Sequence, residues 1–241
     1  MRILLAAALL ATGALPASTG SVNVAVAANF TAAAEDLAAL FTAESGHEVV
    51  LSFGATGQLY AQISQAAPFG VLLAADVERP QLAIAEGLAV ANSFFVYAEG
   101  RLVLYGPGRD LSDGAAALEA DFSRIAIADP QAAPYGKAAL ETLTALGLYA
   151  AVEPKVVWGE NISQTLQFVE TGNAELGFVA ASQVPDKADT WPVPAELHAP
   201  IAQGAVLLKA GADNPAAVEF LVFLQSDAAI AVIEAAGYSV P

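Results

Sequence analysis

The sequence contains no cysteine among its 241 residues. Disulfides therefore cannot hold the fold together, which must rest on an apolar core, and no lipid can be attached through an N-terminal cysteine. Basic residues are also few, because nine Lys and Arg stand against 25 Asp and Glu and leave a formal net charge of -16. Nucleic-acid binding needs clustered cations to neutralise phosphates, so we expect no nucleic-acid partner.

Groups that carry out catalysis are scarce as well. His47 and His198 are the only histidines, and the sequence has no His-x-x-x-His spacing, no Gly-x-Ser-x-Gly elbow and no lysine-bearing Gly-rich loop. Asp76 and Glu78 form a carboxylate pair, but their position favours a helix start and a solvated charge. The sequence therefore predicts a protein that is not an enzyme and that has no protein-bound metal and no cofactor.

No apolar run reaches the ~20 residues that a membrane span needs. The apolar segment Leu4–Ala17 is shorter, follows the single charge of Arg2 and ends in small residues, which is the pattern of a secretory signal peptide. We therefore expect residues 1–17 to be removed, with the mature chain beginning between Ser18 and Val22. Loss of Arg2 changes the net charge of -16 to about -17. Export without cysteine points to a Gram-negative periplasm.

Hydrophobic residues make up 56% of the chain, and they fall into alternating strands and helices. This alternation predicts parallel sheets with right-handed crossovers, in an α/β fold of two lobes with a ligand cleft between them. We expect the first lobe to be discontinuous, over residues 22–98 and 203–241, and the second to cover residues 99–202. The predicted strands are 22–27, 48–53, 71–75, 125–128, 155–158, 176–179 and 205–208. The predicted helices are 30–44, 57–67, 81–85, 136–146, 163–170, 215–224 and 228–236.

Four of these strands lead into a helix through small or uncharged polar residues. In an open α/β sheet the carboxyl ends of the strands face one crevice, where helix N-termini present free N–H groups and partial positive charge. Several such termini directed at one point bind an anion without Lys or Arg. The junctions are Ala28-Asn29-Phe30-Thr31, Gly54-Ala55-Thr56-Gly57, Ala133-Pro134-Tyr135-Gly136 and Glu160-Asn161-Ile162-Ser163.

Each junction taken alone has a simpler explanation. Asn29, Thr56 and Ser163 are residue types that serve as ordinary helix caps. Ordinary caps also use aspartate freely, whereas the central positions of all four junctions are uncharged. A carboxylate there would repel a bound dianion by several kcal/mol in a partly buried cleft, so the pattern favours an anion site.

With these junctions the chain resembles the periplasmic molybdate-binding proteins of ABC transporters, a type II solute-binding family. The resemblance covers the whole mature chain, from the small-residue run before Asn29 to Gly237-Tyr238. Its motifs are Val24-Ala25-Val26-Ala27-Ala28-Asn29-Phe30, Ser52-Phe53-Gly54-Ala55-Thr56-Gly57, Ala128-Asp129-Pro130, Pro134-Tyr135-Gly136-Lys137-Ala138-Ala139-Leu140, Leu176-Gly177-Phe178-Val179 and Phe220-Leu221 with Phe223-Leu224.

The resemblance implies a type II periplasmic binding protein fold and a role for each junction. Asn29 matches a side-chain ligand of the anion, and Thr56 matches the serine of the second junction. Tyr135 and Ile162 match backbone N–H donors before the third and fourth helices. Ala180 stands where some members carry a tyrosine hydroxyl. The implied function is capture of a tetrahedral oxyanion, molybdate or tungstate, for the membrane permease of an ABC importer, by a monomeric periplasmic protein.

Other functions remain open from the sequence. The site could hold another anion such as sulfate, because size and not charge separates these ligands. Phosphate fits less well, since it carries a proton near neutral pH and then needs a buried acceptor, although Glu160 and Asp129 lie close by in sequence. An exported enzyme on the same scaffold, or a receptor-docking role without transport, are the alternatives from other classes.

Overall fold

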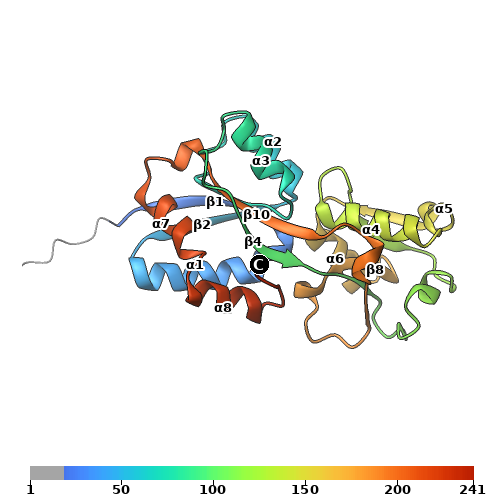
Figure 1. Cartoon of the computed structure of the whole chain (residues 1–241). Coiled ribbons are helices and arrows are strands. Elements are labelled where there is room, and N and C mark those ends of the chain that lie inside the picture. Colours follow the sequence, from blue (N-terminus) through green and yellow to red (C-terminus); the bar gives the residue numbers. More distant parts are fainter. Residues whose placement is uncertain (1–18) are drawn as a thin grey trace, which may run out of the picture.

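A computed structural model describes residues 19–241 and shows two α/β lobes, each built on one five-stranded sheet (Figure 1). The predicted signal peptide, residues 1–17, lies outside the described residues. The chain passes from the first lobe to the second after strand β4 and returns at strand β10, which lie together at the centre of the molecule in Figure 1.

The sheet of the first lobe has the strand order β2-β1-β3-β10-β4. Its parallel half consists of β1 (Ser21–Ala27), β2 (Glu48–Gly54) and β3 (Val71–Leu73). Strand β10 (Ile201–Leu207) runs antiparallel to β3, and β4 (Phe95–Gly100) runs antiparallel to β10. The three strands that are joined by helices are parallel, as predicted, and the antiparallel strands β10 and β4 make the whole sheet mixed.

Both faces of this sheet are covered by helices. Alternation along β1 sends Val22, Val24 and Val26 to one face and Ala25 to the other, so two separate apolar clusters form. The first cluster packs against α1 (with Phe30 before it), α7 and α8, and the second packs against α2 and α3. The helices are α1 (Thr31–Ser45), α2 (Thr56–Ser64), α3 (Glu78–Ala85), α7 (Pro215–Phe223) and α8 (Asp227–Ala235).

The sheet of the second lobe has the order β7-β6-β8-β5-β9. Strand β6 (Ile125–Ala128) lies between and parallel to β7 (Val156–Gly159) and β8 (Leu176–Ala180). Strand β5 (Leu102–Tyr105) is antiparallel to β8, and β9 (Thr190–Pro192) is antiparallel to β5. This sheet is also mixed, because β5, which the chain enters from the first lobe, runs antiparallel to both of its neighbours.

Three helices surround the second sheet: α4 (Pro134–Ala145), α5 (Tyr149–Val152) and α6 (Ile162–Glu170). Strands β4 and β5 are not among the predicted strands, and β9 and helix α5 are too short to show a period. The other predicted strands and helices are present with shifts of a few residues at their ends. The predicted lobe limits stay predictions. The chain passes between the two sheets from β4 to β5 and again from β9 to β10, within a few residues of these limits.

Local residue choices explain where several helices begin and end. Pro134 and Pro215 stand in the first turns of α4 and α7, where the missing proline N–H costs no helical hydrogen bond. Gly46 ends α1 in the left-handed conformation with φ of 75°. No single helix in residues 19–241 is long and apolar enough to cross a membrane; α7 and α8 reach that length only as a pair bent by 65°.

Candidate functional site

All four sequence-predicted site residues line one small cavity between the lobes. Asn29 follows β1, Thr56 begins α2 after β2, Tyr135 stands in the first turn of α4 after β6, and Ile162 begins α6 after β7. The cavity volume is about 10 Å³, close to the least space that holds one water. Its lining comprises Ala27, Ala28, Asn29, Ala55, Thr56, Ala75, Ala133, Pro134, Tyr135 and Ile162.

The cavity is suited to an anion by its helix termini. Helices α2, α4 and α6 begin at its wall, and the first turn of each leaves N–H groups without intrahelical acceptors. These termini carry partial positive charge, and the lining residues include no carboxylate and no charged side chain of either sign. Alanines make up five of the ten lining residues, which lets the backbone approach a ligand closely.

Thr56 is held so that its hydroxyl can donate into the cavity. The side chain is buried, and Thr56 Oγ1 accepts a hydrogen bond of 3.0 Å from the Ala75 N–H. Because an N–H already donates to this oxygen, the hydroxyl proton remains free for another acceptor. Thr56 makes no capping bond to α2. The interpretation of Thr56 as an ordinary helix cap is therefore wrong.

The cap interpretation also fails for Asn29 and Ser163. The helical turns around Asn29 have no side-chain cap. At the fourth junction Asn161 is the cap of α6, because its Oδ1 accepts from the Gln164 N–H at 2.9 Å. Ser163 instead donates from Oγ to the Ala28 carbonyl across the two lobes at 3.1 Å. Its hydroxyl stabilises closure of the lobes and not the end of the helix.

A buried polar network that the sequence did not reveal lies behind the cavity. The Asn29 side chain donates from Nδ2 to Gln203 Oε1 at 3.0 Å and to the Tyr238 hydroxyl at 3.1 Å. Gln203 also accepts from the Tyr97 hydroxyl at 3.0 Å and donates from Nε2 to the Tyr135 hydroxyl at 3.3 Å. The one signal in the sequence is Gln203 itself, a polar residue inside the apolar run Ile201–Leu208.

Burial keeps the three tyrosine hydroxyls of this network protonated. Burial raises the pKa of Tyr97 and of Tyr135 well above the ordinary tyrosine value, and the neighbouring phenols add to the effect. Burial likewise raises the pKa of Tyr238 to about 12, although bonds from Ser182 and Asn29 oppose the shift. The Tyr135 hydroxyl meets Gln203, so what this residue can offer the cavity is its backbone N–H.

Direct hydrogen bonds hold the two lobes closed around the cavity. The Gly57 N–H donates to the Ala132 carbonyl at 2.9 Å, and Ser182 Oγ donates to the Asn29 carbonyl at 3.3 Å. A Cβ on Gly57 would lie 3.1 Å from the Ala132 Cα, so glycine permits this approach of the two backbones. The cavity is thereby enclosed by residues of both lobes.

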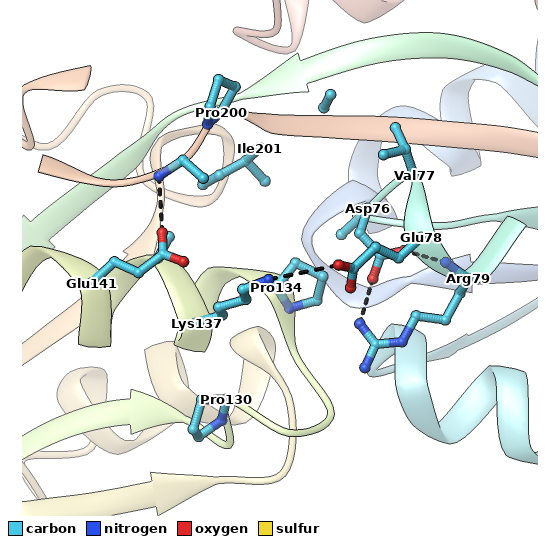
Figure 2. A pocket seen from close by; sticks show the side chains of 14 residues that line it. Asp76, Val77, Glu78, Arg79, Pro130, Pro134, Lys137, Glu141, Pro200 and Ile201 are labelled. Carbon is cyan, nitrogen blue, oxygen red and sulfur yellow. Dashed lines mark hydrogen bonds and ion pairs between the residues drawn. The ribbon is translucent and has the colours of Figure 1, made fainter. Parts of the chain in front are cut away.

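A larger cavity of about 200 Å³ lies next to the first, also between the lobes (Figure 2). Asp76 accepts from the Arg79 N–H at 2.9 Å at the start of α3, and its other oxygen is 2.6 Å from the Arg79 guanidinium. Glu78 lies 3.8 Å from Lys137 of the other lobe. Both cations face carboxylates, and Glu141 adds a further negative charge, so this cavity disfavours a dianion.

Two lobes closed over a cavity at the starts of their helices define a solute-binding protein of the type II periplasmic class. The chain belongs to the bacterial extracellular solute-binding protein family, whose model matches residues 22–239. The family resemblance and the two-lobed α/β fold predicted from the sequence are thereby confirmed.

Relatives at high identity are molybdate-binding proteins. The chain is 51% identical over 229 residues to the molybdate-binding protein ModA of Rhodobacter capsulatus, covering 93% of this chain and 90% of that one. It is 47% identical over 232 residues to ModA of Azotobacter vinelandii, covering 93% and 92%. The solved structure of the Azotobacter vinelandii periplasmic molybdate-binding protein superposes with a TM-score of 0.86 at 37% identity, over 91% of this chain and 99% of that one.

Proposed function

We propose that this protein captures molybdate or tungstate in the periplasm and delivers it to the permease of an ABC importer. The observation that carries the proposal is the convergence of Asn29, Thr56, Tyr135 and Ile162 on one buried cavity without a carboxylate. A neutral site of N–H and O–H donors compensates a dianion through hydrogen bonds and helix dipoles.

Binding without catalysis is part of the proposal. The ten residues that line the cavity include no histidine, cysteine, carboxylate or lysine, so none can act as a general base or as an activated nucleophile. The ligand brings its own metal atom, and we propose that the protein binds it as a whole oxyanion without a resident metal or cofactor. The relatives are binding proteins, which supports this view. We further propose that the mature protein acts as a monomer.

Isothermal calorimetry of the mature protein against molybdate, tungstate, sulfate and phosphate tests the ligand class. We expect molybdate and tungstate to bind far more tightly than phosphate, because the cavity lining has no carboxylate to accept a hydrogen bond from the protonated phosphate. Phosphate binding as tight as molybdate would refute the site assignment. Sulfate binding as tight as molybdate would favour the broader alternative of a general tetrahedral-anion carrier.

Export is tested separately. Mass spectrometry of periplasmic material should give an N-terminus between Ser18 and Val22, as the signal-peptide pattern predicts. Recovery of intact Met1 from the soluble cytoplasmic fraction would refute the proposed location while leaving the ligand assignment untouched.

A further inference from the structure

Gln203 lies behind the cavity and forms hydrogen bonds with a site residue of each lobe. It lies on β10, at the point where the pairing of β10 with β4 shifts register, and its side chain is fully buried. One end of its amide contacts Asn29 of the first lobe, and the other contacts Tyr135 of the second. Gln203 does not line the cavity itself. It can therefore act on a ligand only through the residues that it holds.

The direction of the Asn29 amide is the feature on which Gln203 acts. An amide nitrogen has two hydrogens, and both hydrogens of Asn29 Nδ2 are donated, one to Gln203 and one to Tyr238. Among residues 19–241, no hydrogen bond reaches Asn29 Oδ1, and no fully buried side-chain oxygen lacks a partner, so Oδ1 borders open space. Since Asn29 lines the cavity, the amide turns its acceptor toward the position of the anion.

The same atom positions support the opposite direction of bonding. If the Gln203 amide turns over, Nε2 donates to Asn29 and to Tyr97, and Oε1 accepts from the Tyr135 hydroxyl. Tyr97 then donates to the Ala74 carbonyl, which lies 3.3 Å away. Tyr238 donates across its 3.1 Å contact to Asn29 Oδ1, and Ser182 Oγ bonds the Asn29 backbone carbonyl at 3.3 Å. Every group stays bonded, and the Asn29 N–H groups become free to face the cavity.

We propose that Gln203 is a positioning residue that turns the donor side of the Asn29 amide toward a bound oxyanion. In the structure, Gln203 Oε1 holds the Asn29 N–H groups away from the cavity. With ligand, the reversed Gln203 amide donates to Asn29 Oδ1, and Asn29 Nδ2 donates to the anion. The inference rests on the proposed function, because it assumes an anion in this cavity.

Molybdate calorimetry on five proteins tests this role: the wild type, Gln203→Glu, Asn29→Ala, the double variant and Gln225→Glu. A carboxylate at position 203 can only accept, so it fixes the Asn29 N–H groups away from the ligand. We expect Gln203→Glu to weaken binding about tenfold to a hundredfold, the scale of one charge-assisted bond. Gln225 is exposed after α7, and its variant controls for added charge with a wild-type Kd expected.

The double variant separates positioning from simple repulsion. If Gln203 acts through Asn29, Gln203→Glu should cost less than about threefold once Asn29 is alanine. The factor by which Gln203→Glu weakens molybdate binding in the wild-type background, divided by the same factor in the Asn29→Ala background, should then be above about three. A ratio below this value would overturn the positioning role. Failure of the wild type to bind molybdate or tungstate would instead refute the proposed function.

The wild-type protein provides a second readout if Gln203→Glu does not fold, as judged by its melting curve. In nitrogen-15 NMR the Asn29 side-chain amide protons should show contacts to the Tyr238 ring in the free protein. We expect these contacts to disappear on addition of molybdate, as Asn29 Oδ1 takes the place of Nδ2. Contacts that persist unchanged in the saturated complex would overturn the proposal.

Discussion

The two lobes share one plan and differ in how they meet the ligand cavity. Their strand orders, β2-β1-β3-β10-β4 and β7-β6-β8-β5-β9, correspond strand for strand. In each lobe the central parallel strand and its outer neighbour lead into the helical turns that reach the cavity. Asn29 therefore corresponds to Tyr135, and Thr56 corresponds to Ile162.

The first lobe presents polar side chains where the second presents backbone. Thr56 has a free hydroxyl proton, and Asn29 has an amide, whereas Ile162 is apolar and the Tyr135 hydroxyl faces Gln203. Donors that belong to the backbone survive almost any change of side chain. Side-chain substitutions should therefore alter affinity mainly through the first lobe, even if both lobes contribute equally to binding.

Thr56→Asp should have the largest effect. Aspartate can still accept from the Ala75 N–H, so the fold should be kept, but its charge would face a dianion at short range. Repulsion of several kcal/mol corresponds to a loss of affinity on the order of a thousandfold. Calorimetry with molybdate measures the loss, and Thr42→Asp on the exposed side of α1 is the matched control. Wild-type affinity in Thr56→Asp would remove this residue from the site.

Alanine at Thr56 or at Asn29 should have the next largest effect. Each change removes one charge-assisted hydrogen bond of about 1.5–3 kcal/mol, which weakens the Kd roughly tenfold to a hundredfold. Paired measurements of melting temperature and Kd separate this loss from a loss of folding stability. A lowered melting temperature with unchanged affinity would show that the two side chains serve the fold alone.

Ile162→Ala should barely change affinity. The backbone N–H remains, so we expect the Kd for molybdate to stay within about threefold of the wild-type value. The side chain is buried, and its truncation should lower the free energy of unfolding by about 2–4 kcal/mol. Urea unfolding and calorimetry on the same sample check both numbers. A tenfold loss of affinity would contradict the assignment of the second lobe as a backbone donor.

Raising the pH should have the smallest effect on binding. A raised tyrosine pKa favours the neutral phenol in the folded state, so the contribution of Tyr238 to folding is complete below about pH 10 and is lost as the pH rises toward about 12. We therefore expect a constant Kd and melting temperature between about pH 7 and pH 9, with loss of stability only at higher pH. A drop in affinity that follows tyrosine ionisation in this range would contradict the closed network.

Much of the fold and the position of the site could be predicted from local patterns. The apolar strands and the uncharged junctions are properties of short segments, and the carboxyl ends of neighbouring strands must meet at one edge. That is enough to bring Asn29, Thr56, Tyr135 and Ile162 together. The pattern contains no strand direction, which is why the antiparallel direction of β4, β5, β9 and β10 could not be predicted.

The network behind the site could not be predicted in the same way. Asn29 meets Gln203 and Tyr238 across separations of 174 and 209 residues, and no local period records such contacts. The direction of an amide is likewise invisible in a sequence, because both directions satisfy the same residue types. A lone glutamine within an apolar strand is the kind of exception that marks a bonded partner elsewhere.

The backbone bond from Gly57 to Ala132 has a kinetic consequence. It joins the lobes beside a cavity whose lining is mostly buried, so a captured ion leaves most readily when the lobes part. Residence time is then set by how often the lobes part, and contacts from the ion to both lobes make parting rarer. Ions that bond more strongly to both lobes would leave more slowly, and an importer that pulls the lobes apart would speed their release.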